Sequence, residues 1–197
     1  MKKASLLLTF TVLAQLCFAQ YFTLTPKGFL GENQSEYIVL DFPGAKQADL
    51  YKRVQGALIS MYKDPKEVLS FIEGESITVN GYQPNAITNK RRANALAIAK
   101  ATYEYDLSYS LSIFFKDEKI RFNRPTFECR RWYEGGYKSN WATGWSYLPL
   151  VKQKNNTTGI FNNKGEIIAP DVIEDLNKYL NSLIKEILDK AQNSNDW

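Results

Sequence analysis

The sequence contains no histidine and only two cysteines among its 197 residues. Without histidine, a Ser-His-Asp or Cys-His catalytic centre and a histidine-ligated metal site cannot form. Phosphate-binding glycine loops, dinucleotide-binding fingerprints and clustered metal ligands are missing as well, so the sequence predicts no cofactor and no metal site. The commonest hydrolase chemistries are therefore excluded, and no particular reaction is indicated.

The sequence also has no apolar run long enough to cross a bilayer, which takes roughly 20 residues. The most apolar stretch, from Ala4 to Phe18, follows two lysines and is followed by the small residue Ala19. A short apolar run between a basic start and a small residue is typical of a secretory signal peptide. We therefore expect residues 1–19 to be removed, and the exported protein not to be an integral membrane protein.

Loss of this leader lowers the net charge from +4 to +2, because the leader carries two lysines and no acidic residue. An exported chain with so little excess charge is a poor candidate for binding nucleic acid. The leader also contains Cys17, so Cys129 is left without a partner for an internal disulfide. We expect Cys129 to be a buried small hydrophobe, since no histidine is available to activate its thiol.

Hydrophobic periodicity predicts the order of the elements. The strongest signal is the alternation of apolar and polar residues over 103–115, which predicts a long strand with one face toward the core. Apolar residues at helical spacing predict a C-terminal helix over 171–192. Residues 82–101 are interpreted as a loop with a short alanine-rich helix, and residues 20–35 as an irregular lead-in. The remaining predicted elements are strands 37–42, 68–72, 76–80 and 120–123 and a helix over 50–61.

The order β-α-β-β-β-β-α predicts an α+β fold in one domain over residues 20–197. In this arrangement the long C-terminal helix packs on a curved antiparallel sheet. A chain of this length buries roughly 70% of the surface that its unfolded form exposes, which is enough to hold the fold without a disulfide.

Two stretches of the sequence carry a family resemblance. Residues 37–51 read YIVLDFPGAKQADLY and residues 114–122 read FFKDEKIRF. Over about residues 37–122 the chain resembles a family of exported Gram-negative bacterial proteins of unknown function. The resemblance implies a fold like one repeat of the TATA-box-binding protein (TBP-like, or helix-grip-like) and implies no activity. The family's turn reads Lys-Asp-Gly-Lys, whereas Glu118 replaces the glycine here, so we expect a loop wider than two residues.

Aromatic residues and glycines gather between residues 127 and 150 without an obvious period. Flat rings beside hydrogen-bonding groups suit stacking on sugars or apolar ligands, and arginines there can pair with a carboxylate or phosphate. A loop of this length is uncommon in a compact domain unless it has a function, although its rings can also fill a gap in the core. The candidate ligand-binding residues are Arg130, Arg131, Trp132, Tyr133, Tyr137, Trp141, Trp145 and Tyr147.

Paired carboxylates are the only acid–base resource of the sequence. Glu73 and Glu75 flank a glycine, and Glu104 and Asp106 share one face of the predicted long strand. A glycosidase needs two carboxylates on either side of a cleft. We interpret these four acids, and the basic run at 90–92, as solvated surface charge.

Together these features favour an exported, non-enzymatic binding or interaction protein, periplasmic or associated with the cell surface of a Gram-negative bacterium. Its ligand or partner is a small molecule, a glycan, a lipid or an envelope protein. Two alternatives stay open: a carboxylate-dependent hydrolase of an envelope polymer, and a structural component of an envelope assembly.

Overall fold

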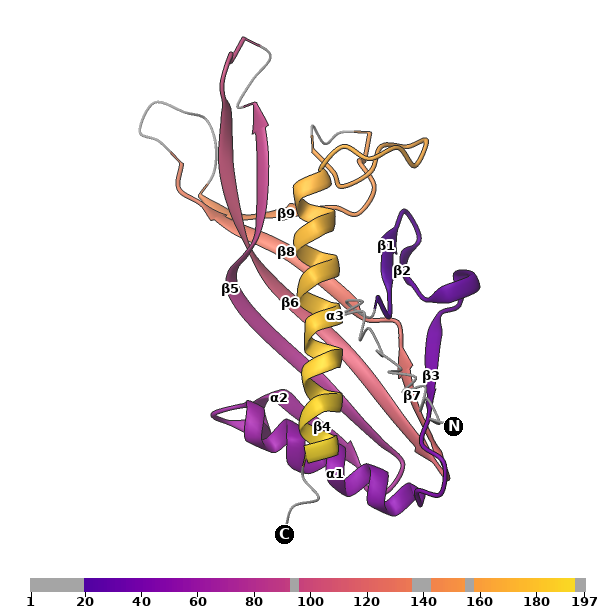
Figure 1. The fold of residues 1–197 in the computed structure, drawn as a ribbon. Coiled ribbons are helices and arrows are strands. Elements are labelled where there is room, and N and C mark those ends of the chain that lie inside the picture. Colours follow the sequence, from indigo (N-terminus) through magenta and orange to yellow (C-terminus); the bar gives the residue numbers. More distant parts are fainter. Residues whose placement is uncertain (1–19, 93–95, 136–142, 155–157, 194–197) are drawn as a thin grey trace, which may run out of the picture.

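The structure is a computed structural model that describes residues 20–92, 96–135, 143–154 and 158–193. A long sheet and a long helix form most of it (Figure 1). The predicted signal peptide, residues 1–19, lies outside the described residues. In chain order the elements are β1 Thr23–Thr25, β2 Gly28–Leu30, a 3-10 turn Glu32–Gln34, β3 Tyr37–Asp41, α1 Gln47–Met61, α2 Pro65–Val68, β4 Leu69–Ile72, β5 Ser76–Arg92, β6 Lys100–Lys116, β7 Lys119–Asn123, β8 Thr126–Tyr133, β9 Gly144–Leu148 and α3 Pro170–Asn193.

The main sheet is antiparallel and has seven strands, with β6 at its centre. Its continuous path runs β3-β7-β6-β5-β4, and β8 and β9 extend it from β6. One side of β6 pairs with β5 along nearly its whole length. The other side pairs with β8 at residues 106–110 and with β7 at residues 113–116. The long strand predicted over 103–115 is thus the strand that organises the sheet.

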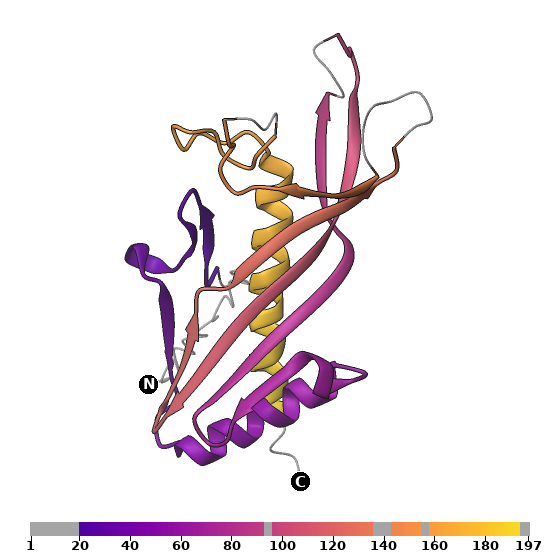
Figure 2. The same ribbon diagram turned by 180° about the vertical axis from the view of Figure 1, so that it is seen from behind.

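The helix α3 covers one face of this sheet. Its apolar stripe, which includes Leu176, Leu180 and Ile187, is almost completely buried against the inward side chains of β5 and β6. α1 packs beside the C-terminal half of α3 at one end of the sheet. The predicted α+β fold, with a C-terminal helix on an antiparallel sheet, is therefore confirmed. Seen from behind, the opposite face of the sheet is not covered by α3 or α1 (Figure 2).

Polar side chains of α3 hold the N-terminal strand. Asn181 accepts a hydrogen bond from the backbone N–H of Phe22 at 2.9 Å and donates one to its carbonyl at 2.8 Å. Asn177 accepts one from the N–H of Leu24 at 2.8 Å. The segment interpreted as an irregular lead-in thus contains the β1–β2 hairpin. The N–H groups of Phe22 and Leu24 bind side chains of α3 instead of a third strand.

Acidic side chains on another flank of α3 bind the edge of β5. Asp175 accepts hydrogen bonds from the backbone N–H and the hydroxyl of Thr88, at 2.8 and 2.7 Å. Asp171 accepts one from the N–H of Lys90 at 3.3 Å. Because these carboxylates satisfy amides that none of the described strands reaches, they close an edge at which another chain could otherwise add.

The prediction of a loop and short helix over residues 82–101 is wrong. β5 continues to Arg92 and β6 begins at Lys100, so the two strands extend as a ribbon beyond the rest of the sheet. A β-bulge between Gln83 and Ile87 shifts their register, and Asn85 there has φ of +50°. Pro84 and Asn85, which suggest a loop in the sequence, lie within this bulge. Pairing between the two strands overrides the helix propensity of the alanines that follow Arg92.

The turn between β6 and β7 is tight, contrary to our expectation. Lys116 pairs with Lys119, so only two residues form the turn, and Glu118 adopts the left-handed conformation with φ of +63°. The Glu118 carboxylate accepts a hydrogen bond from the N–H of Gly44 at 2.9 Å. Asp117 accepts one from the N–H of Gln47, the first residue of α1, at 2.9 Å. These bonds offset the strain of a non-glycine residue at this position.

Tyr109 on β6 packs directly over Gly81 of β5. The two residues are cross-strand neighbours, and a Cβ atom at position 81 would lie 2.1 Å from Cζ of the tyrosine ring. The ring is buried, contacts Tyr179 of α3 edge-on, and its hydroxyl lies 3.2 Å from that of Tyr62. Burial raises the pKa of the Tyr109 phenol. Gly81 thus makes room for the aromatic contact between β6 and α3.

We expect Gly81→Ala to lower the free energy of unfolding by about 2 kcal/mol or more, because the added methyl group displaces a buried ring. Gly56→Ala is the matched control, since Gly56 lies within α1 and a Cβ there meets no atom within 4 Å. Alanine at that position should stabilise the protein by about 0.5 to 1 kcal/mol. Urea denaturation measures both changes, and an unchanged stability of Gly81→Ala would contradict the contact.

A second prediction concerns the exposed acid that caps α1. The hydrogen bond from Gln47 and the nearby Lys46 lower the pKa of Asp117 below its ordinary value of 3.8. The charged form thus stabilises the folded state above pH 3.8, and this contribution is lost as the pH falls through the lowered pKa. Asp117→Asn should be less stable than wild type at neutral pH, and the difference should shrink in acid.

Denaturation midpoints measured from pH 7 down to strongly acidic pH test this dependence. Asp64→Asn serves as the control, because Asp64 precedes α2 without a side-chain hydrogen bond to the helix. A constant difference between Asp117→Asn and wild type across this pH range would show that the charge of Asp117 does not stabilise the helix.

Candidate functional site

The segment predicted as an aromatic loop over 127–150 is in large part a β-hairpin. β8 and β9 pair antiparallel, with Trp132 opposite Trp145 and Arg130 opposite Tyr147. The prediction of a loop is wrong because glycines and bulky aromatics obscure the alternation, although aromatic residues have high strand propensity. Since side chains alternate along a strand, the candidate residues are divided between the two faces of the sheet.

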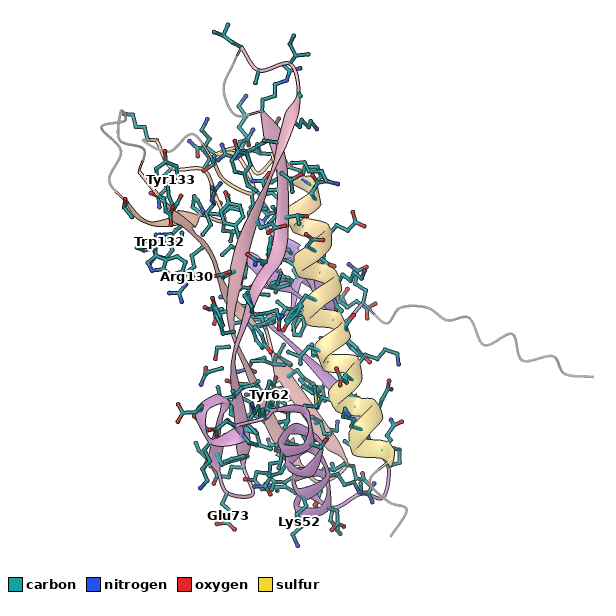
Figure 3. The ribbon with its side chains drawn as sticks, turned by 90° about the vertical axis from the view of Figure 1, so that its left-hand side faces the viewer. Lys52, Tyr62, Glu73, Arg130, Trp132 and Tyr133 are labelled. Carbon is teal, nitrogen blue, oxygen red and sulfur yellow. The ribbon has the colours of Figure 1, made fainter. Side chains whose placement is uncertain are left out.

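Arg130 lies over the rings of Tyr82 and Trp145 on the open face, and two further aromatic residues adjoin them. We name these four rings and Arg130 the aromatic cluster. Trp132 and Trp145 meet edge to face, with ring centroids 5.3 Å apart. The guanidinium carbon of Arg130 lies 4.4 Å from the centroid of Trp145. Figure 3 shows Arg130 and Trp132 on the side of the sheet away from α3. The aromatic cluster consists of Tyr82, Arg130, Trp132, Trp145 and Tyr147.

The rings of this cluster are half exposed. Their exposed fractions are 52% for Tyr82, 49% for Trp132, 42% for Trp145 and 49% for Tyr147. Such exposure leaves ring faces in contact with water, although large aromatic side chains usually bury most of their area. In the described part of the chain, the Nε of Arg130 is buried and has no hydrogen-bond partner. The cluster therefore combines apolar planar surface with a fixed positive charge.

Tyr82, which the sequence analysis did not select, joins this cluster from β5. Arg130 lies 5.7 Å from the centroid of its ring. The hydroxyl of Tyr82 donates a 2.6 Å hydrogen bond to Asp106, which also accepts the N–H of Asn85 in the bulge at 3.0 Å. This bond to a carboxylate raises the pKa of Tyr82, and Arg130 opposes the shift. In the sequence, the Pro84-Asn85 pair that follows Tyr82 and Gln83 is the feature that could have indicated a bulge here.

Of the other predicted candidates, Arg131 and Tyr133 do not join this cluster. Arg131 lies on the face that carries Tyr103, with its guanidinium carbon 4.9 Å from that ring, and Arg91 lies 4.3 Å from the same ring. Tyr133 alternates with Trp132 and so belongs to the face of Arg131. Tyr137 and Trp141 lie outside the described residues.

A second aromatic and basic group lies at the other end of the open face. Arg121 of β7 is 4.6 Å from the centroid of Phe114 and 5.5 Å from that of Tyr37. Two adjacent grooves of about 680 and 450 Å3 share Arg121 and Tyr37. Their charged groups are partly paired, since Glu36 lies 3.0 Å from Arg124. Between the two ends, the sheet presents serine and threonine side chains such as Ser110 and Thr78.

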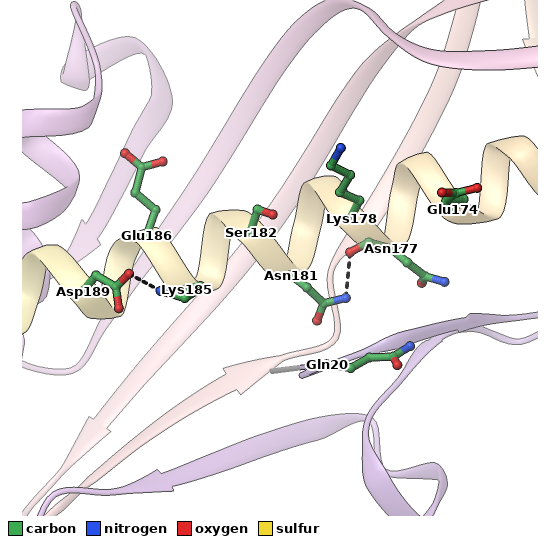
Figure 4. A pocket seen from close by; sticks show the side chains of 9 residues that line it. All are labelled: Gln20, Glu174, Asn177, Lys178, Asn181, Ser182, Lys185, Glu186 and Asp189. Carbon is green, nitrogen blue, oxygen red and sulfur yellow. Dashed lines mark hydrogen bonds and ion pairs between the residues drawn. The ribbon is translucent and has the colours of Figure 1, made fainter. Parts of the chain in front are cut away.

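Another groove, of about 530 Å3, runs along the polar side of α3 (Figure 4). Its polar groups already bind one another, since Lys185 pairs with Asp189, and Asn181 donates to the carbonyl of Asn177 at 2.7 Å. The same asparagines hold β1. This groove is therefore explained by the packing of the fold, and is a weaker candidate than the aromatic cluster. Its lining residues are Gln20, Glu174, Asn177, Lys178, Asn181, Ser182, Lys185, Glu186 and Asp189.

The four carboxylates considered for hydrolysis do not converge. Glu73 and Glu75 are exposed at the turn between β4 and β5, where the carbonyl of Glu75 binds the N–H of Phe115. Asp106 lies nine residues from Phe115 along β6, and at the rise of a strand this places it roughly 30 Å from the turn that carries Glu73 and Glu75. Glu104 is exposed, and Asp106 holds the bulge. No cleft brings members of the two pairs together among the described residues.

Comparison with solved structures identifies the class of the fold. A TBP-like protein from Parabacteroides distasonis matches with a TM-score of 0.50 and 12% identity, over 80% of this chain and 91% of its own. A DUF4468 family protein from Bacteroides ovatus matches with a TM-score of 0.49 and 11% identity, over 79% of this chain and 84% of its own. No family model and no curated protein matches the sequence. The predicted TBP-like fold is confirmed, and at this identity the likeness shows the fold alone.

Cys129 is buried beneath the hairpin, as predicted. Only 1% of its surface is exposed, and burial raises the pKa of its thiol to about 12. The carboxylate of Glu128 adds to this shift. A thiol that stays protonated and inaccessible at neutral pH is a poor nucleophile.

The Cys129 thiol should therefore resist a thiol reagent such as dithionitrobenzoate in the native protein, and react within minutes once urea unfolds the chain. Absorbance of the released thiolate measures the rate. Cys129→Ser is the control that removes the signal. Rapid reaction of the folded protein at neutral pH would contradict the burial of this side chain.

Proposed function

We propose that the protein is an exported binding protein of the bacterial cell envelope, and that its aromatic cluster binds a glycan that carries an anionic group. The observation that carries the proposal is the exposure of four rings around Arg130 on a sheet face that α3 leaves open. Half-exposed rings lower their free energy when a ligand covers them, by roughly 25 cal/mol per Å2 of apolar area.

The chemistry of the cluster favours a sugar with a carboxylate or phosphate. Trp132 and Trp145 stand at a steep angle, with an interplanar angle of 75°, so their faces can contact two sides of a puckered ring. A sugar presents C–H groups to such faces. Arg130 supplies N–H donors in a planar fork that matches a carboxylate or phosphate. Tyr147, opposite Arg130, adds a hydroxyl at the rim.

Export is supported by the sequence of residues 1–19 and by the contacts of the residues that follow them. Gln20 is exposed, whereas Phe22 is almost completely buried and bonded to Asn181. Cleavage after Ala19 would leave β1 and its contacts with α3 intact. Among the described residues, no helix has both the length and the apolar character needed to cross a bilayer.

Tryptophan fluorescence titrated with a panel of anionic and neutral oligosaccharides tests this function. We expect saturable binding of anionic sugars by wild type. Trp145→Ala should weaken binding about tenfold, because it removes a stacking face and the ring beside Arg130. Arg130→Gln should weaken the binding of anionic sugars by about tenfold or more, and affect neutral sugars less.

Phe71→Ala is the matched control, since Phe71 is 41% exposed on β4, away from the cluster. Calorimetry on the same panel separates lost affinity from a lost fluorescence signal in the tryptophan variant. Binding of duplex DNA without binding of any sugar would contradict the proposal. So would sugar affinities that are the same for wild type, Trp145→Ala and Arg130→Gln.

A further inference from the structure

The ribbon formed by β5 and β6 extends beyond the bulge and projects from the body of the protein (Figures 1 and 2). Its cross-strand pairs continue to Arg92 and Lys100, where the ladder ends. We call residues 87–92 and 96–105 the arm. It extends past β4 and β8, and α3 binds its base through Asp175 at Thr88 and Asp171 at Lys90. Beyond Lys90 the strands of the arm pair only with each other among the described residues.

The end of the arm exposes two large aliphatic side chains. Leu96 is 92% exposed and Ile98 is 95% exposed, whereas the next most exposed large hydrophobic residue in the described part of the chain, Ile167, reaches 61%. One alanine lies between these two residues, and a second alanine follows Ile98. Single exposed hydrophobic residues need no explanation, but two of them almost fully exposed at the end of a projection favour contact with an apolar medium.

Positive charge surrounds this apolar end. The stretch from Lys90 to Tyr103 contains four basic residues and no acidic one. Arg92 and Lys100 lie directly opposite each other in the last pair of the ladder. Like charges in this position destabilise a strand pair, so an anion placed beside them would relieve a repulsion built into the arm. Lys90 is exposed two residues further down, roughly 7 Å from Arg92 along the strand.

We propose that the arm docks the protein on an anionic phospholipid bilayer, with Leu96 and Ile98 inserted at the boundary between headgroups and acyl chains. In this position Arg92 and Lys100 lie at the level of the phosphates. Interfacial segments insert about 5 to 10 Å, a depth that brings Lys90 into the headgroup region as well. The docking is peripheral, and it is independent of any ligand at the aromatic cluster.

A bilayer explains both halves of this feature. A soluble polyanion would pair with the basic residues but leave Leu96 and Ile98 in water. An apolar protein pocket would cover those two side chains but would not require four basic residues without an acid among them. A surface that places phosphates directly above hydrocarbon has the same order of charge and apolar character as the arm.

Flotation with lipid vesicles tests the proposal. We expect wild type to float with vesicles of phosphatidylglycerol and phosphatidylethanolamine, and not with vesicles of phosphatidylcholine alone. The double variant Leu96→Ser, Ile98→Ser should partition at least tenfold more weakly. The double variant Arg92→Gln, Lys100→Gln should lose roughly twenty-five-fold in partitioning, since each basic residue near an anionic surface contributes about fivefold. Raised salt should weaken wild-type binding.

Two control variants match these changes elsewhere on the surface. Ile72→Ser together with Ile167→Ser removes two exposed aliphatic side chains, and Lys63→Gln together with Lys66→Gln removes two exposed charges. Both controls, and Trp145→Ala, should float like wild type, the last because docking does not need the aromatic cluster. Equal thermal midpoints of the arm variants and wild type ensure that lost binding is not lost folding.

Three results would overturn the proposal. The first is absence of flotation with anionic vesicles. The second is flotation that the serine double variant leaves unchanged, which would show that the apolar end does not insert. The third is binding that depends only on Arg92 and Lys100 and is fully displaced by dextran sulfate, which would assign the arm to a soluble polyanion or an acidic protein.

Discussion

The burial of one face of the sheet by α3 is the constraint on which the rest of the structure depends. The helix contributes its apolar stripe to the core, and its polar flanks bind two separate strands. Asn177 and Asn181 hold β1, while Asp171 and Asp175 hold the edge of β5. Because one helix serves both strands on the same side of the sheet, the other side stays open. The aromatic cluster occupies that open side, and one of its strands, β5, packs against α3.

Much of the fold could be predicted because its strongest elements have clear periods. The alternation over 103–115 and the helical stripe over 171–192 identify β6 and α3, and the short turn at Gly74 identifies the hairpin of β4 and β5. The arm could not be predicted, because its alanines favour a helix locally, while its fold is decided by pairing between residues 8 to 18 positions apart. The β1–β2 hairpin was missed for a similar reason, since its stabilising partners lie on α3.

The candidate site was predicted in part. Sequence composition selects the segment with Arg130, Trp132, Trp145 and Tyr147, but it could not divide the side chains of this segment between two faces. That division depends on the register of β8 with β6, in which Arg130 lies opposite Asp106. The same register brings in Tyr82 from β5, a residue almost 50 positions earlier than Arg130. No spacing within the aromatic segment carries that information.

The attachment of β1 to α3 has a consequence for how the protein is made. Phe22 is synthesised well before the side chain that binds its backbone, since Asn181 follows 159 residues later. Chain synthesis is vectorial, so β1 stays without its partner until α3 has emerged. Completion of the fold therefore waits for the C-terminal helix, and a chain that lacks α3 leaves both its earliest strand and the core of its sheet exposed to water.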